Sequence, residues 1–173
     1  MAEFERTGKA KELFDQAMKL KMGDKFNGIE PDYTKAISLY NEVLKLVPDD
    51  WKSYGDRSVC YRELGQEENA LADINKAISL NPQVSYLYTD RGYTYYQLGE
   101  TEKAVADIEK AAELNTKCPA IVYFKFGEKI EKLTGDKRTA AVYLKKAVEL
   151  GDVKLGDGDY ENMAKKLLDK WGM

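Results

Sequence analysis

Two consecutive segments of equal length decide the fold. Residues 51–84 read WKSYGDRSVCYRELGQEENALADINKAISLNPQV, and residues 85–118 read SYLYTDRGYTYYQLGETEKAVADIEKAAELNTKC. When residues 51–82 are aligned with residues 85–116 at an offset of 34, 15 positions are identical. A fixed period between about 20 and 50 residues is typical of architectures that stack one unit on the next. The chain is therefore predicted to be a repeat protein.

Each segment is predicted to form two antiparallel helices joined by a short turn. Side chains at helical spacing follow one another in both halves of the first segment: Tyr54, Ser58 and Tyr61, then Ala70, Ile74 and Ala77. Gly65 lies between the halves, where a tight turn needs a residue without a Cβ. The predicted helices are 51–64 and 67–80, then 85–98 and 101–114.

The same pattern continues more faintly on both sides, and we interpret residues 1–173 as a single domain. Repeat 1 covers about 10–48 with an insertion near 23–31, which reads GDKFNGIEP and is rich in turn residues. Repeats 2, 3 and 4 cover 51–84, 85–118 and 120–150, the last with helices over 120–133 and 137–149. After a Gly- and Asp-rich loop, a capping helix over 159–170 is predicted to turn Tyr160, Met163, Ala164 and Leu167 inward.

The composition disfavours several classes of protein. Charged residues make up 33% of the chain, but the net charge is only −3. A nucleic-acid binder would carry a basic surface, and so would a protein that binds an anionic membrane. No apolar run approaches the length of a membrane span, and residues 1–10 lack the apolar core of a secretory signal. We therefore expect a soluble cytoplasmic protein, unless a signal was removed.

The residues needed for most catalytic and metal sites are missing. The chain has no histidine and two cysteines, Cys60 and Cys118. This removes the commonest general base, the histidine-paired nucleophiles and most zinc sites. Cys60 is predicted to be buried and Cys118, near a repeat junction, partly exposed and oxidisable. A calcium loop starting at Asp157 fails because Asn162 and Leu168 replace the required glycine and glutamate. We expect no enzyme activity, no cofactor and no metal.

The 34-residue unit resembles the tetratricopeptide repeat. The residues of the first unit that carry the resemblance are Tyr54, Ser58, Tyr61, Gly65, Ala70, Ile74, Ala77 and Pro82. Arg57 departs from the usual apolar residue, and Thr116 replaces the proline in the next unit. The resemblance covers about residues 10–150. It implies an all-α, right-handed α-solenoid of antiparallel helix pairs, whose first helices line a concave groove for a peptide or helix of a partner.

A second stripe on the first helices carries more aromatic surface than stacking requires. Aromatic side chains are favoured at interfaces, because they bury much area at little entropic cost. We predict a peptide-binding site formed by Lys52, Val59, Arg62, Tyr86, Tyr93, Tyr96, Phe124 and Lys125. The alternative is that these rings pack against the neighbouring first helix.

The chain is interpreted as a non-catalytic protein–protein interaction module or adaptor. It is expected to bind another protein, to be a monomer or weak homodimer, and to contact neither nucleic acid nor the membrane interior. One subgroup of the resembled family grips the carboxylate end of heat-shock chaperones, but Asp56 and Asp90 stand at two positions of that grip. Two alternatives are a secretion-type chaperone for an exported segment and a regulatory or self-assembling structural subunit.

The repeat also predicts two ion pairs. Arg57 lies in the first helix of its unit and Asp73 in the second, and Arg91 and Asp107 repeat the arrangement. An antiparallel hairpin brings these faces together, and the arginine fork can donate two hydrogen bonds to one carboxylate. We therefore expect both pairs to form near the core.

Overall fold

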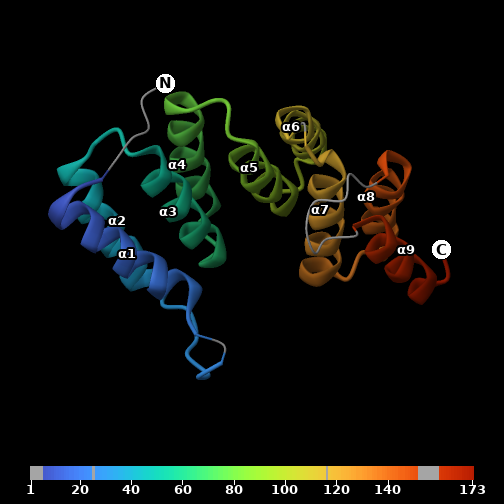
Figure 1. Ribbon diagram of the computed structural model, residues 1–173, viewed down its shortest axis with the longest axis horizontal. Coiled ribbons are helices and arrows are strands. Elements are labelled where there is room, and N and C mark those ends of the chain that lie inside the picture. Colours follow the sequence, from blue (N-terminus) through green and yellow to red (C-terminus); the bar gives the residue numbers. More distant parts are fainter. Residues whose placement is uncertain (1–5, 25, 116, 152–159) are drawn as a thin grey trace. The chain divides into compact units, whose positions relative to one another are not determined.

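The computed structural model describes residues 6–24, 26–115, 117–151 and 160–173. The helices in these residues are α1 (Gly8–Met22), α2 (Tyr33–Leu46), α3 (Trp51–Glu63), α4 (Glu67–Leu80), α5 (Ser85–Gln97), α6 (Thr101–Leu114), α7 (Pro119–Thr134), α8 (Lys137–Leu150) and α9 (Tyr160–Trp171) (Figure 1). Within the described residues no β-strand forms, apart from an isolated bridge between Asp24 and Ile29. The all-α prediction is confirmed, and helices α3 to α9 begin and end within one residue of the predicted bounds.

The chain divides into two compact units, residues 1–83 and residues 84–173, which are described separately. In the first unit α1 packs with α2 and α3 packs with α4, and the contact between α2 and α3 joins the two pairs. In the second unit α5 packs with α6 and α7 with α8, while α9 lies against α8 and α7. Stacked helix pairs with a terminal capping helix are thus confirmed. The grouping of the repeats into one domain stays a prediction.

Small residues on the first helices allow the second helices to approach closely. A Cβ added to Gly92 in α5 would lie 3.1 Å from Cδ1 of Ile108. A Cβ added to Gly127 in α7 would lie 2.9 Å from the carbonyl oxygen of Ala140. The end of a side chain can move more easily than a helix backbone. A larger residue is therefore tolerated less well at position 127 than at position 92.

Both predicted arginine–aspartate pairs are present, which confirms that prediction. Arg57 donates from Nε and Nη2 to the Asp73 carboxylate at 2.6 and 2.7 Å, and Arg91 donates to Asp107 at 2.8 and 2.7 Å. The two aspartates are buried. The hydrogen bond with Asp107 raises the pKa of the Arg91 guanidinium above its usual value. Each guanidinium also lies 5.5 to 5.8 Å from the centroids of two tyrosine rings: Tyr54 and Tyr61, or Tyr88 and Tyr95.

A third arginine–aspartate pair ties the residues before α1 to the start of α3. Arg6 donates to the Asp50 carboxylate from Nε and, at 2.8 Å, from Nη2. The Asp50 side chain is wholly buried and also accepts hydrogen bonds from the Ser53 hydroxyl and the Lys52 amide. Arg6 further lies over the ring of Phe14, 3.5 Å from its centroid. The repeat pattern could not predict this pair, because Val84 replaces Asp50 in the next unit.

Two predictions about individual residues are wrong. Met163 is exposed, because α9 buries the stripe that passes through Ala164 and Leu168 instead. Cys118 is buried beside the first turn of α7, not partly exposed. Cys60 is buried as predicted, and its removal from water raises the pKa of the thiol to about 12. The predicted loop over 152–159 lies outside the described residues.

Candidate functional site

Three of the predicted site residues form the tyrosine face of α5, defined as Tyr86, Tyr93 and Tyr96. Their spacing places them on one side of the helix. Tyr86 is 47% exposed, and the other two are partly exposed. Tyr93 stacks on Phe126 of α7 with ring centroids 5.0 Å apart, and Tyr96 meets the same ring edge-on at 6.1 Å. Packing against the neighbouring first helix therefore accounts for part of each of these two rings, and the remaining surface faces solvent.

Phe126 supports two of these tyrosines, Tyr93 and Tyr96. Its ring is fully buried and meets Tyr143 of α8 edge-on, with centroids 4.8 Å apart. Burial raises the pKa of the Tyr143 hydroxyl above its usual value. Aromatic pairs of this geometry contribute about 0.5 to 1.5 kcal/mol beyond their buried area. The exposed parts of Tyr93 and Tyr96 are therefore presented by a rigid cluster that joins α5, α7 and α8.

The two predicted site residues of α7 have different surroundings. Phe124 is only 3% exposed, because its ring packs on Tyr160 of α9 with centroids 5.5 Å apart. Lys125, the next residue, is exposed. The capping helix thus covers the aromatic residue and leaves the cation in solvent.

The remaining three predicted residues belong to α3, in the first unit. Lys52 and Val59 are partly exposed, and the Lys52 ammonium lies 5.4 Å from the centroid of the Trp51 ring. Arg62 has a buried side chain that pairs with Glu63 at 3.2 Å. The structure therefore groups the predicted residues as three in the first unit and five in the second.

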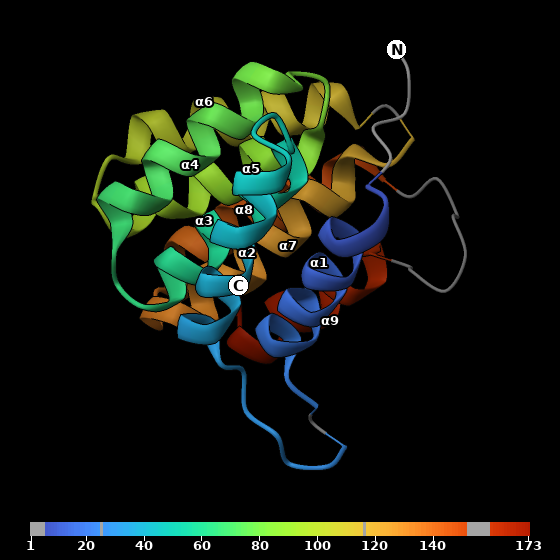
Figure 2. The ribbon, with the colours of Figure 1, turned by 90° about the vertical axis from the view of Figure 1, so that its left-hand side faces the viewer.

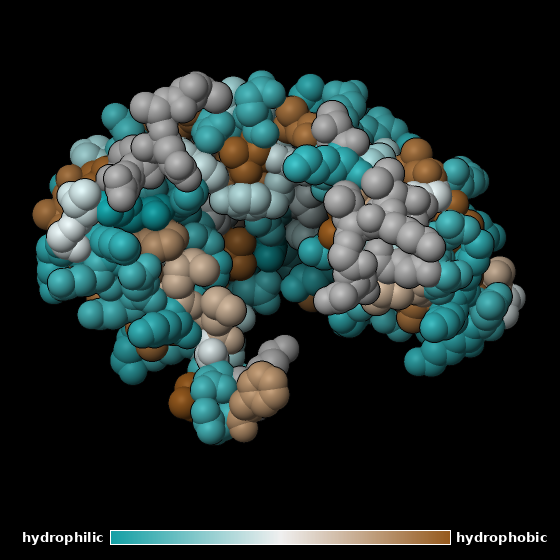
Figure 3. Space-filling view, in the orientation of Figure 1, coloured by the Kyte–Doolittle hydropathy of each residue, from teal (hydrophilic) through white to brown (hydrophobic). Residues whose placement is uncertain are grey.

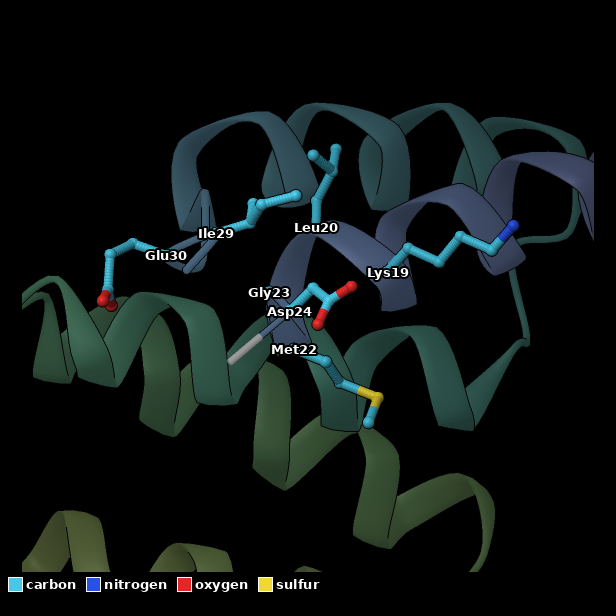
Figure 4. A pocket seen from close by; sticks show the side chains of 7 residues that line it. All are labelled: Lys19, Leu20, Met22, Gly23, Asp24, Ile29 and Glu30. Atoms are coloured by element: carbon cyan, nitrogen blue, oxygen red, sulfur yellow. The ribbon is translucent and has the colours of Figure 1, made fainter. Parts of the chain in front are cut away.

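The connection between α1 and α2 contains a pocket that the sequence analysis missed. This connection extends beyond the ends of both helices, and apolar surface covers part of it (Figures 2 and 3). A pocket of about 530 Å³ lies at its base, lined by Lys19, Leu20, Met22, Gly23, Asp24, Ile29 and Glu30 (Figure 4). The turn residues predicted an interruption of the helices. The signal that could have indicated a site was the pair of large apolar residues, Phe26 and Ile29, inside that polar segment.

The described residues contain neither a cluster of metal-binding side chains nor a helix that could span a membrane. No three Cys, Asp or Glu side chains in residues 6–24, 26–115, 117–151 and 160–173 lie close enough to hold a metal ion together. Among the same residues, no helix combines the length and the apolar character needed to cross a membrane.

Comparison with known families identifies the repeats. The model of the tetratricopeptide repeat family matches residues 52–84 and 85–118. These two segments therefore match the tetratricopeptide repeat, which confirms the resemblance for residues 52–118. Hsp70-Hsp90 organizing protein 3 of Arabidopsis thaliana is 34% identical over 64 residues. That match covers 36% of this chain and 12% of the relative.

Solved structures share the fold over most of the chain. MamA (residues 41 to the end) from Desulfovibrio magneticus RS-1 is 22% identical with a TM-score of 0.60, and the match covers 82% of this chain and 75% of MamA. PilW, a type IV pilus biogenesis factor, is 21% identical with a TM-score of 0.63, over 84% of this chain and 63% of PilW. These similarities show that the chain has the helical-repeat fold of both proteins.

Proposed function

We propose that the chain is a non-catalytic protein-binding module or adaptor. In this proposal the second unit holds an extended segment or a helix of another protein against the tyrosine face of α5. The observation that carries the proposal is that this face leaves Tyr86 about half exposed and two further rings partly exposed on a rigid support. Tyrosine is enriched among the residues that dominate binding energy, because a large ring with few rotamers loses little entropy on binding.

The polar groups around this face favour a ligand with hydrogen-bonding groups. Tyrosine hydroxyls can donate to or accept from a peptide backbone. Asp90 lies on α5 between Tyr86 and Tyr93, and Lys125 is exposed on α7, so the second unit carries both charge signs. Rim charges of this kind mainly affect the association rate and its salt dependence.

The acidic residues disfavour a ligand held by its C-terminal carboxylate. Asp90 would repel such a group, and Asp56 of α3 already forms an ion pair with Lys21. The name of the Arabidopsis relative mentions Hsp70 and Hsp90, and a chaperone tail bound through its terminal carboxylate does not suit these aspartates. We therefore propose an internal segment of the partner as the ligand.

One buried member of the predicted site is given an indirect role. Phe124 is covered by Tyr160, so we propose that it supports the binding surface of the second unit by packing. Arg62 is buried in the first unit and is not part of this surface. Lys125 of the second unit is proposed as a peripheral contact, because its side chain is exposed. For Lys52 and Val59 of the first unit, a role in binding stays a prediction from the sequence.

The experiment begins with capture and identification of a partner from native lysate. Hydrogen exchange is then measured with and without that purified partner. We expect protection of α5, and we expect Tyr86→Ala and Tyr93→Ala to weaken binding about 10- to 1,000-fold, the range for truncated anchor residues. Val142→Ala is the matched control, because Val142 is 63% exposed on α8 and lies outside the proposed surface. Protection of α6 and α8, with unchanged affinity of both tyrosine variants, would contradict the proposal.

A further inference from the structure

Asp24 and Ile29 close a hairpin between α1 and α2, and we call its described residues, 23, 24 and 26–31, the insertion hairpin. The backbone N–H of Asp24 donates to the carbonyl of Ile29 at 2.7 Å, and the N–H of Ile29 donates back at 2.8 Å. The Asp24 carboxylate accepts from the amides of Phe26 and Asn27 at 3.1 and 3.2 Å. It also accepts from the Asn27 side chain at 2.7 Å, and these bonds to Asn27 lower the pKa of Asp24. The turn is therefore held by its own polar groups.

The glycines of the insertion hairpin fit this conformation. Gly23 has φ of 63°, and a Cβ there would lie 2.4 Å from the carbonyl oxygen of Ile29. Gly28 has φ of 68°, in the left-handed region that only glycine adopts freely. The sequence of the hairpin thus specifies its shape.

This shape keeps apolar side chains in water. Phe26 is fully exposed, and Met22 and Ile29 are each more than half exposed. In the space-filling view, apolar surface covers part of the projection formed by the hairpin (Figure 3). Singly scattered exposed apolar residues are normal, but three large ones within eight residues of sequence on one projection indicate a contact surface.

The pocket at the base of the insertion hairpin fits a phenyl ring. Leu20, Met22 and Ile29 line its apolar part, and its volume is about 530 Å³. A cavity of about 150 Å³ lined by similar side chains is large enough for benzene. Phe26 is not among the lining residues, so its own ring does not fill the pocket. The same hairpin therefore carries an apolar projection and a pocket of matching chemistry.

The charges at the pocket rim are also complementary to each other. Lys19 and Glu30 lie at opposite ends of the lining (Figure 4). In the part of the chain that the structure describes, neither side chain forms an ion pair. A contact around a two-fold axis uses the same patch on both copies, and each feature must meet its complement. The third charged residue of the lining, Asp24, uses its carboxylate within the turn. The projection, the pocket and the charges of Lys19 and Glu30 together meet the two-fold requirement.

We propose that the insertion hairpin is a self-association site for a second copy of this chain. Two hairpins pair antiparallel about a two-fold axis, each Phe26 ring enters the pocket of the other copy, and each Lys19 faces the Glu30 of the other copy. The contact involves few side chains and falls below the roughly 1,200 Å² of stable interfaces, so the dimer is weak. This site lies in the first unit and is separate from the tyrosine face of α5.

The test is sedimentation equilibrium of the full chain between about 10 µM and about 1 mM, a range that brackets weak association. We expect the average mass of the wild-type protein to rise with concentration toward that of a dimer. Phe26→Ser should remain monomeric, whereas Val142→Ser should behave like wild type, because it removes an exposed apolar side chain elsewhere. Equal melting temperatures would show that both variants are folded.

A charge exchange tests the two-fold arrangement. Lys19→Glu or Glu30→Lys alone places like charges opposite each other and should weaken the dimer about three- to tenfold. The double variant restores opposite charges and should recover the wild-type constant. A monomeric mass at every concentration would overturn the proposal, and the hairpin would then be a candidate contact surface for a different protein. A dimer insensitive to Phe26→Ser, or a double variant weaker than both single variants, would also overturn it.

Discussion

Loss of Arg91 should destabilise the second unit through the carboxylate that it leaves behind. In Arg91→Met, Asp107 would lose both guanidinium hydrogen bonds, although its side chain is only 8% exposed. Removing one partner of a buried ion pair costs about 3 to 5 kcal/mol. The Arg91 side chain is 20% exposed, so water can reach part of the site. We therefore expect the lower end of that range, about 3 kcal/mol.

The assay is urea unfolding followed by far-ultraviolet circular dichroism. With an m-value of about 2 kcal/mol/M, a loss of about 3 kcal/mol moves the midpoint down by about 1.5 M. The control is Lys110→Ala, which breaks an exposed pair between Lys110 and Glu113 on α6. Exposed pairs contribute about 0 to 1 kcal/mol, so the control should shift the midpoint by less than about 0.5 M.

A double variant separates the cost of an unpaired charge from other effects. Arg91→Met combined with Asp107→Leu replaces the ion pair by apolar side chains, which is often neutral or stabilising. We expect it to regain most of the stability lost in Arg91→Met. A midpoint of Arg91→Met within about 0.3 M of wild type would refute the reasoning. So would a double variant no more stable than Arg91→Met, because the loss would then not arise from the buried carboxylate.

Three further outcomes follow from the packing and the titratable groups. Gly127→Ala should lower stability by about 1 to 3 kcal/mol, whereas Gly92→Ala should stay close to wild type in the same urea assay, because better helix propensity offsets a softer contact. Cys60 and Cys118 should not react with a thiol reagent at pH 8 until urea unfolds the chain, and early labelling of either would contradict their burial. Hydrogen bonds, chiefly the one with Thr139, lower the pKa of Asp136 at the start of α8. The Asp136 carboxylate therefore stabilises the fold above the pKa that it has in the unfolded chain, and this stabilisation is lost as the pH falls through its pKa in the folded protein. Asp136→Ala should therefore reduce the melting temperature at pH 7 and leave it nearly unchanged at pH 2, and an equal effect at both values would exclude this cause.

The local fold could be predicted because the same pattern of residues occurs in two consecutive segments. Helical spacing of small and aromatic residues places α3 to α6, and the glycine between helices marks each turn. The pairs of Arg57 and Arg91 could be predicted as well, because an antiparallel hairpin fixes which faces meet. The Asp50 pair lacked such a signal, since its partner Arg6 lies 44 residues away and outside the repeat.

The candidate site was less predictable, because exposure depends on contacts between distant elements. Phe124 fits a binding stripe by spacing, but Tyr160 of α9 covers it across a connection whose path the sequence does not reveal. Met163 and Ala164 both fit a helical stripe, so spacing alone could not select the buried one. Glycine and asparagine indicated a turn over residues 23–31, but turn propensity does not show that Phe26 would point into solvent.

The Arg6–Asp50 pair changes where the first unit can be cut. A fragment that started at Gly8, where α1 begins, would look complete from its helices, yet it would leave the Asp50 carboxylate wholly buried with only neutral donors from Ser53 and Lys52. The stability of this unit therefore depends on a side chain outside its first helix, that of Arg6. Truncations, tags and fusions placed at the visible start of α1 would act on a buried charge in another helix pair.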